Sequence, residues 1–243
     1  MKISIAIALF ISTSYLTTAQ TLGKIVSKGK ELTTSSSSSQ SPLSNDEVVS
    51  GLREALTTGA KTAASKAGVT DGFYKNPKLF IPWPSEATEM KDKLVKLGMQ
   101  SQVTQFEESV NRAAEEASKS AYEVFAGAVK GMSVGVGFAI LNGSDTAATH
   151  YLREKTTASL TEKFKPIVKT AMEKVRVTEY WTPLVTKYNK IPLVTKQNPD
   201  LEAYVTAKAI DGLMLLISEQ EAKIRKDPAA QVTDLLKKVF GKK

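Results

Sequence analysis

Two polar clusters in the sequence combine residue types that can bind or transform a ligand. In the first, Glu108, Arg112 and Glu115 are spaced four and three residues apart, with Asn111 beside them. On a helix this spacing lets one guanidinium bridge two carboxylates. On an exposed face that is ordinary charge pairing, whereas inside a helical bundle it is a buried network. The sequence leaves both interpretations open.

The second cluster is a polar turn at residues 142–146 that leads into a predicted helix. Its candidate site residues are Asn142, Asp145 and Arg153, because the free amides at a helix N-terminus bind anions. We favour the simpler interpretation of a well-capped helix, with Asp145 or Ser144 as the cap. If the two clusters met in one cleft, their carboxylates would suit a hydrolase acting on cell-envelope material.

Most residues of the familiar catalytic and metal-binding sites are missing. The chain has one histidine, His150, and no cysteine, which excludes a histidine-rich metal site, disulfides and a cysteine nucleophile. Neither glycine-rich phosphate motif occurs, and no Gly-x-Ser-x-Gly turn presents a serine nucleophile. We therefore assign no catalytic residue, metal ligand or cofactor, and favour a protein that is not an enzyme.

Residues 1–19 have the pattern of a signal peptide. Lys2 precedes an apolar run over residues 3–11, and small residues occupy positions −3 and −1 of a cut before Gln20. The run is shorter than the roughly 20 residues that a spanning helix needs, and no later stretch exceeds it. We therefore expect a periplasmic or secreted protein with no membrane-spanning segment after cleavage.

The net charge indicates which classes of partner the protein can bind, and the composition indicates where its folded domain begins. The formal net charge of +8 falls by one with the loss of Lys2. This surplus is small and dispersed, so it indicates acidic partners such as anionic lipid headgroups and argues against nucleic acid. Residues 20–43 include the run TTSSSSSQSPLS, which predicts a disordered tether. The folded domain is expected over residues 44–243.

The domain is predicted to be all-α, a single-domain helical bundle with irregular aromatic-rich connections. Ser44 and Glu47 form a capping box that starts a helix to about Lys66. Residues 132–141 fit a short buried helix or a strand, because two glycines weaken both assignments. The other expected helices run from Ser85 to Gly98, from Ser101 to about Lys130, from the polar turn towards Phe164 with a kink or break at Pro166, from Leu201 to Lys226, and from Asp227-Pro228 towards Phe240, with Val232 on its apolar face.

Two irregular segments, residues 68–84 and 175–199, are unusually aromatic. Packing over the core is the simpler explanation and the one we favour, and lining of a ligand groove is the functional one. We expect an exported protein that binds a hydrophobic or amphipathic ligand, or an envelope component such as a lipid, through these segments. A structural scaffold without ligand is a further alternative. The candidate ligand-lining residues are Phe73, Tyr74, Phe80, Trp83, Tyr180 and Trp181.

Seven blocks of the sequence together resemble the bacterial domain-of-unknown-function family 4197, over nearly everything after the tether. The resemblance implies an exported helical family without an established activity, and it transfers no catalytic residue. Family members tend to have a more polar segment, with an acidic residue, where this chain has VGVGF at 134–138. The blocks are GLREALTTGA at 51–60, DGFYKNP at 71–77, NRAAEEA at 111–117, ILNGSDTAATHYLREKT at 140–156, FKPIV at 164–168, YVTAKAIDGL at 204–213 and EAKIRKDPAAQVTDLLKKVFG at 221–241.

Overall fold

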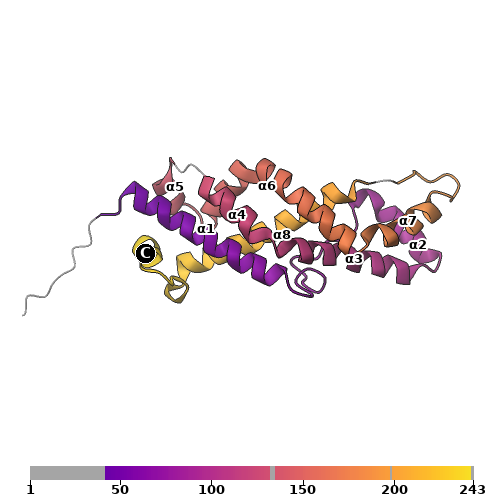
Figure 1. The fold of residues 1–243 in the computed structure, drawn as a ribbon, viewed down its shortest axis with the longest axis horizontal. Coiled ribbons are helices and arrows are strands. Elements are labelled where there is room, and N and C mark those ends of the chain that lie inside the picture. Colours follow the sequence, from indigo (N-terminus) through magenta and orange to yellow (C-terminus); the bar gives the residue numbers. More distant parts are fainter. Residues whose placement is uncertain (1–41, 132–134, 198, 242–243) are drawn as a thin grey trace, which may run out of the picture. The chain divides into compact units, whose positions relative to one another are not determined.

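The computed structural model describes residues 42–131, 135–197 and 199–241, and over these ranges the fold is all-α, as predicted (Figure 1). The predicted signal peptide and the tether up to residue 41 lie outside the described residues. No helix in the described ranges is long and apolar enough to cross a membrane. The helices are α1 (Asn45–Ala67), the 3₁₀ turn η1 (Ser85–Ala87), α2 (Thr88–Lys96), α3 (Gln100–Ser118), α4 (Ala121–Gly131), α5 (Gly137–Leu141), α6 (Ala147–Lys174), α7 (Val177–Tyr188), α8 (Leu201–Lys226), the 3₁₀ turn η2 (Pro228–Ala230) and α9 (Asp234–Phe240).

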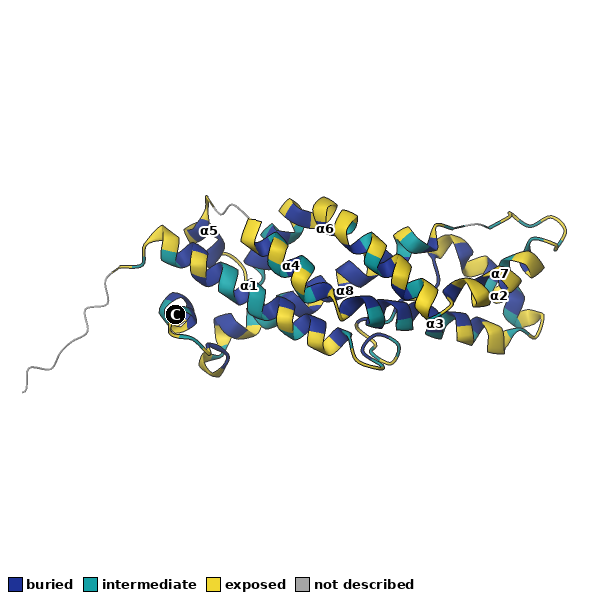
Figure 2. Ribbon diagram, in the orientation of Figure 1, coloured by how far each residue is buried: buried dark blue, intermediate teal, exposed yellow. Residues whose placement is uncertain are grey.

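Helices α1, α6 and α8 form the centre of the bundle, with α8 packed against both others. The capping box that starts α1 is confirmed: the Glu47 N–H donates to the Ser44 hydroxyl, and the Ser44 N–H donates to the Glu47 carboxylate. The predicted apolar face of α1, which includes Leu52 and Leu56, is fully buried. In Figure 2 the buried residues form dark blue bands along these helices.

The prediction of one long helix over residues 101–130 was wrong, because α3 and α4 are separate. At the end of α3 the Ser118 hydroxyl donates to the Ala114 carbonyl at 2.7 Å. The next two N–H groups, of Lys119 and Ser120, donate to carbonyls only three residues back, which tightens the turn and ends the helix. The alanine-rich stripe continues across this turn, so the hydrophobic pattern does not reveal it.

Three other helix boundaries differ from the prediction. Neither Ser144 nor Asp145 caps α6, whose N-cap position is Thr146 and lacks a side-chain cap of its own. Of the two predicted alternatives at Pro166, the break is wrong, because Pro166 lies inside α6, which runs as one helix to Lys174. Ser85 makes no capping hydrogen bond and lies in η1, so α2 begins at Thr88.

The segment after α8 was predicted as one helix and is a 3₁₀ turn followed by α9. Asp227 caps this turn as expected, but Thr233 caps α9 separately. Val232, predicted on a buried face, lies between the two elements and is exposed. Within the segment 175–199, expected to be irregular, residues 177–188 form α7 with Pro183 inside it. Residues 137–141 form the helix α5, which favours the helical alternative for this part of the segment 132–141, whose residues 132–134 lie outside the described residues.

Candidate functional site

Asn111 attaches the aromatic loop, residues 68–84, to α3. Its side chain is fully buried, and its Oδ1 accepts the Ile81 N–H at 2.8 Å. Its Nδ2 donates to the Ile81 carbonyl at 3.0 Å and to the Glu107 carbonyl at 2.9 Å. One amide side chain therefore satisfies both backbone groups of a loop residue, which buried polar groups require.

Glu115 and Arg112 hold the beginning of the same loop. Glu115 Oε1 accepts the N–H groups of Phe73 and Tyr74, each at 3.1 Å, and Oε2 binds Arg112 at 2.8 Å. Arg112 also bridges to Asp71 in the loop and to Glu108 on α3, the latter in the predicted spacing. Both Glu115 oxygens are thus occupied, in an arrangement suited to fixing the loop.

The hydrogen bonds of the Arg112 network shift the pKa of two of its members, Asp71 and Arg112. Hydrogen bonds from Lys75 and then from Arg112 lower the pKa of Asp71 below its ordinary value. Burial lowers the pKa of Arg112, but hydrogen bonds to Glu115, Asp71 and Glu108 more than reverse this effect and raise it. Asp71 also has a positive φ of 66°, so the loop turns sharply where the guanidinium binds it.

Three of the six candidate aromatic residues lie in the core. Trp83 contacts Phe106 with ring centroids 4.8 Å apart, and Trp181 contacts both rings at 5.7 and 4.8 Å. None of the six lines the hollows that lie along α6 or the one at α5 and α9. Phe73, Trp83 and Trp181 are buried, Tyr74 and Phe80 are half-buried, and Tyr180 is exposed.

The residues of the second cluster lie beside α8 and not beside the loop. Asp145 forms an ion pair with Lys226, and Arg153 forms one with Asp211 at 2.5 Å. Asn142 is exposed just after α5. These ion pairs connect the second cluster to α8, whereas the first cluster is connected to the loop 68–84. Within the described residues, no group of three or more histidine, aspartate or glutamate side chains could hold a metal ion.

A buried acid on α8, which the sequence analysis missed, caps α6. Glu221 is fully buried and accepts the N–H groups of Ala148 at 3.0 Å and Thr149 at 2.7 Å. It also accepts the Thr149 hydroxyl at 2.7 Å. The carboxylate lies where the helix dipole favours negative charge, so it supplies the cap that the polar turn before α6 does not.

Arg225, one turn further along α8, neutralises Glu221 and binds the end of α5. It donates to the Glu221 carboxylate at 2.8 Å, to the Leu141 carbonyl at 2.7 Å and to the Ile140 carbonyl at 3.1 Å. Its guanidinium lies 5.5 Å from the centre of the Phe240 ring. A glutamate and an arginine four residues apart among apolar residues of α8 were the sequence signal for this pair.

Arg225 and Asn142 are the polar residues lining a cavity of about 250 Å³, which we call the terminal cavity. Phe138, on α5, belongs to its wall and is 42% exposed. Asn142 is thus the candidate polar residue that borders an apolar hollow. The remaining lining residues are Leu43, Leu141, Val239 and Phe240.

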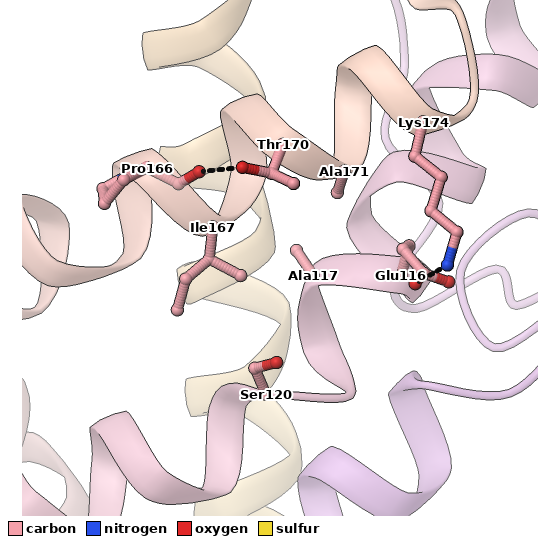
Figure 3. A pocket seen from close by; sticks show the side chains of 8 residues that line it. All are labelled: Glu116, Ala117, Ser120, Pro166, Ile167, Thr170, Ala171 and Lys174. Atoms are coloured by element: carbon pink, nitrogen blue, oxygen red, sulfur yellow. Dashed lines mark hydrogen bonds and ion pairs between the residues drawn. The ribbon is translucent and has the colours of Figure 1, made fainter.

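A second hollow, of about 410 Å³, lies beside Pro166 where α6 passes the turn between α3 and α4. Figure 3 shows Ile167 and Ala171 of α6 pointing towards Ala117 and Ser120. An ion pair between Lys174 and Glu116 lies at one side of this hollow. Glu116 also forms an ion pair with Lys119, so two lysines share its charge, and Lys174 is largely exposed to solvent.

The comparisons with known proteins give a family and no activity. The family described as "Protein of unknown function (DUF4197)" matches residues 42–241. The chain belongs to this family, because the match covers nearly all the described residues. No curated protein and no solved structure matches the chain.

Proposed function

We propose that this DUF4197 protein is an exported, non-enzymatic binding protein that holds the apolar part of an amphipathic ligand in the terminal cavity. The observation that carries the proposal is the composition of the cavity wall, which joins apolar side chains from α5 and α9 to a buried guanidinium. Ligand sites typically combine mainly apolar walls with a few polar groups that fix orientation.

The charge of the site favours a ligand whose polar group is neutral. Glu221 already neutralises Arg225, so a ligand carboxylate would gain little net attraction. The contacts of Arg225 to Glu221, Ile140 and Leu141 engage four of its five N–H groups. Among the described residues these contacts leave one Nη1 hydrogen of Arg225 for a ligand oxygen, and Asn142 lines the same cavity.

The volume limits the size of the ligand. About 250 Å³ is below the roughly 300 Å³ at which pockets for drug-sized molecules begin. The cavity therefore accommodates a single short apolar chain or ring and not a whole lipid. Phe138 at the rim is exposed enough to cover the part of the ligand that extends outwards.

Export is the second part of the proposal, and it rests on the sequence pattern of residues 1–19. The intact mass of the chain recovered from the periplasmic fraction tests it. The mass should correspond to a chain that begins at Gln20. A chain that keeps residues 1–19 and stays in the cytoplasmic fraction would contradict export.

Native mass spectrometry of the protein purified from its own host tests the ligand. We expect an adduct of defined mass on the unmodified chain and its loss in Asn142→Trp, because the exposed Asn142 borders the cavity and an indole fills its opening. The matched control is Thr178→Trp, at an exposed position of α7. An adduct that survives Asn142→Trp, or no adduct on the unmodified chain, would contradict the proposal.

A further inference from the structure

The connection between α7 and α8 is a loop (Figure 1), and it exposes two apolar residues, Pro192 and Leu193, which we call the tip. Leu193 is fully exposed and follows the exposed Pro192. On either side, Ile191 and Val194 are half-buried and pack against the core. The two flanking residues therefore anchor the tip while the proline and the leucine project from it.

The base of this connection is closed by hydrogen bonds, so the tip has a defined shape. The Asn189 side chain donates to the Gln197 carbonyl at 3.2 Å and accepts the Gln197 N–H at 3.0 Å. Leu193 has a φ of 64°, a left-handed conformation that is uncommon for any residue other than glycine. A backbone in such a conformation persists only where its surroundings hold it, and functional segments often contain one.

The charged side chains within residues 180–199 have one sign, and acidic residues flank this stretch at Glu179 and Asp200. Between residues 180 and 199 the chain contains three lysines and no acidic residue. Lys187, Lys190 and Lys196 are all exposed. A bilayer with anionic lipids has negatively charged headgroups at its surface and an apolar interior beneath them. An apolar tip with three lysine side chains nearby complements both layers.

We propose that the connection between α7 and α8 binds anionic bilayers, with Pro192 and Leu193 inserted below the headgroups and the three lysines against the phosphates. Among the described residues, the protruding Leu193 side chain has no flat apolar surface around it, so a protein partner could bury little area on it. A bilayer can surround such a side chain with lipid on all sides. This proposal is independent of the terminal cavity, which lies at α5 and α9. It concerns attachment to the surface of a membrane.

A fluorescent label on the tip tests insertion directly. Because the chain contains no cysteine, Leu193→Cys provides a single site for an environment-sensitive dye. Vesicles of phosphatidylglycerol and phosphatidylcholine should shift the dye emission to the blue, and vesicles of phosphatidylcholine alone should not. The same dye on Val232→Cys, at the exposed apolar residue before α9, should show no shift.

The contribution of each residue to the affinity for anionic vesicles is measured on the whole protein, with every variant purified in the same way. Leu193→Asp should weaken binding to the anionic vesicles about tenfold or more. The matched Val232→Asp should leave it unchanged. Lys190→Gln combined with Lys196→Gln should weaken it about thirtyfold, and added salt should reproduce much of that loss.

Three results would overturn the proposal. The first is binding to anionic vesicles that Leu193→Asp and Val232→Asp leave equally strong, which would assign attachment to another part of the chain. The second is no dye shift at position 193. The third is a change of oligomeric state in Leu193→Asp without any effect on vesicles, which would identify a second copy of the chain as the occupant.

Discussion

Glu221 and Arg225, one turn apart on α8, bind the facing ends of two other helices. The carboxylate accepts N–H groups at the start of α6, and the guanidinium donates to carbonyls at the end of α5. Each charge meets the helix end whose dipole favours it, and the two charges neutralise each other. The polar turn between α5 and α6 is therefore fixed from α8, and two of the residues involved, Arg225 and Leu141, also line the terminal cavity.

Removal of Glu221 should destabilise the protein strongly. Glu221→Ala leaves Arg225 buried without its counterion and two N–H groups of α6 without acceptors. We expect the free energy of unfolding to fall by about 3–5 kcal/mol, measured by urea denaturation. Simultaneous replacement of Glu221 and Arg225 by methionine should cost less than the sum of the single changes.

The matched control for this prediction is Glu219→Ala. Glu219 lies two residues earlier on α8 and pairs at the surface with Lys78. Its removal should change the free energy of unfolding by less than about 1 kcal/mol. Equal effects of the two substitutions would show that the buried pair does not fix the ends of α5 and α6.

Asn111 should be the residue on which attachment of the aromatic loop depends most. Asn111→Ala leaves the N–H and the carbonyl of Ile81 buried without partners, which should cost about 3 kcal/mol. Because Trp83 follows this point closely and is buried, we expect a red shift of tryptophan emission and faster proteolysis within residues 68–84.

Gln102→Ala on the exposed face of α3 is the control for Asn111. It keeps every contact between α3 and the loop, so emission and proteolysis should match those of the unmodified protein. Retention of the emission maximum in Asn111→Ala would mean that the packing of Trp83 against Phe106 and Trp181 holds the loop without the amide.

Docking of α9 on α1 should depend on pH in the acid range. Hydrogen bonds from Lys238 and then from the Ser44 N–H lower the pKa of Glu47 from 4.5 to about 2. A depressed folded-state pKa gives stability that is fully present above pH 4.5 and is lost as the pH falls towards 2. Glu47→Gln should therefore lose part of this acid dependence, measured as the melting temperature between pH 5 and about 2.

Lys238→Gln supplies the control for this effect, because it removes the largest cause of the shift while keeping the carboxylate. Between pH 5 and about 2, the melting temperature of Lys238→Gln should depend on pH less than that of the unmodified protein. A curve for Glu47→Gln that parallels that of the unmodified protein throughout the acid range would disprove the coupling.

What could be predicted from the sequence depended on how far apart the interacting residues lie along the chain. The start of α1 was predicted correctly because Ser44 and Glu47 are three residues apart, and α8 because its apolar face repeats without interruption. The cap of α6 comes from Glu221, which is 72 residues away from Thr149. Local patterns contain no information on such a partner, so a cap was predicted within the turn instead.

In the candidate site, too, contacts between residues close in sequence were predicted and contacts between distant residues were not. The spacing of Glu108, Arg112 and Glu115 correctly predicted their ion pairs, but the additional contacts to Asp71 and to the backbone of Phe73 cross 41 and 42 residues. The terminal cavity draws its wall from residues as distant as Leu43 and Phe240. Of the sequence candidates, Asn142 alone lines this cavity, and it was predicted as part of an anion-binding or capping turn and not of an apolar cavity.

Replacement by alanine should have opposite effects on the free energy of unfolding at two helical glycines, Gly51 and Gly127. The comparison tests how closely α9 packs on α1. A Cβ atom at Gly51 would lie 2.6 Å from a methyl group of Val239 on α9. That distance is too short for carbon atoms, so α9 has to shift, and Gly51→Ala should cost about 1–3 kcal/mol. Because α9 also lines the terminal cavity, retention of the ligand should weaken in the same variant.

Gly127→Ala is the matched substitution, since a Cβ atom there meets nothing within 4 Å on the exposed side of α4. Alanine restricts the unfolded chain more than glycine does, so this variant should be more stable by about 0.5–1 kcal/mol. Urea denaturation of both variants checks the pair. If Gly51→Ala were as stable as Gly127→Ala, α9 could not be packed against α1 at this distance, and the wall that Val239 and Phe240 give to the terminal cavity would have to be formed differently.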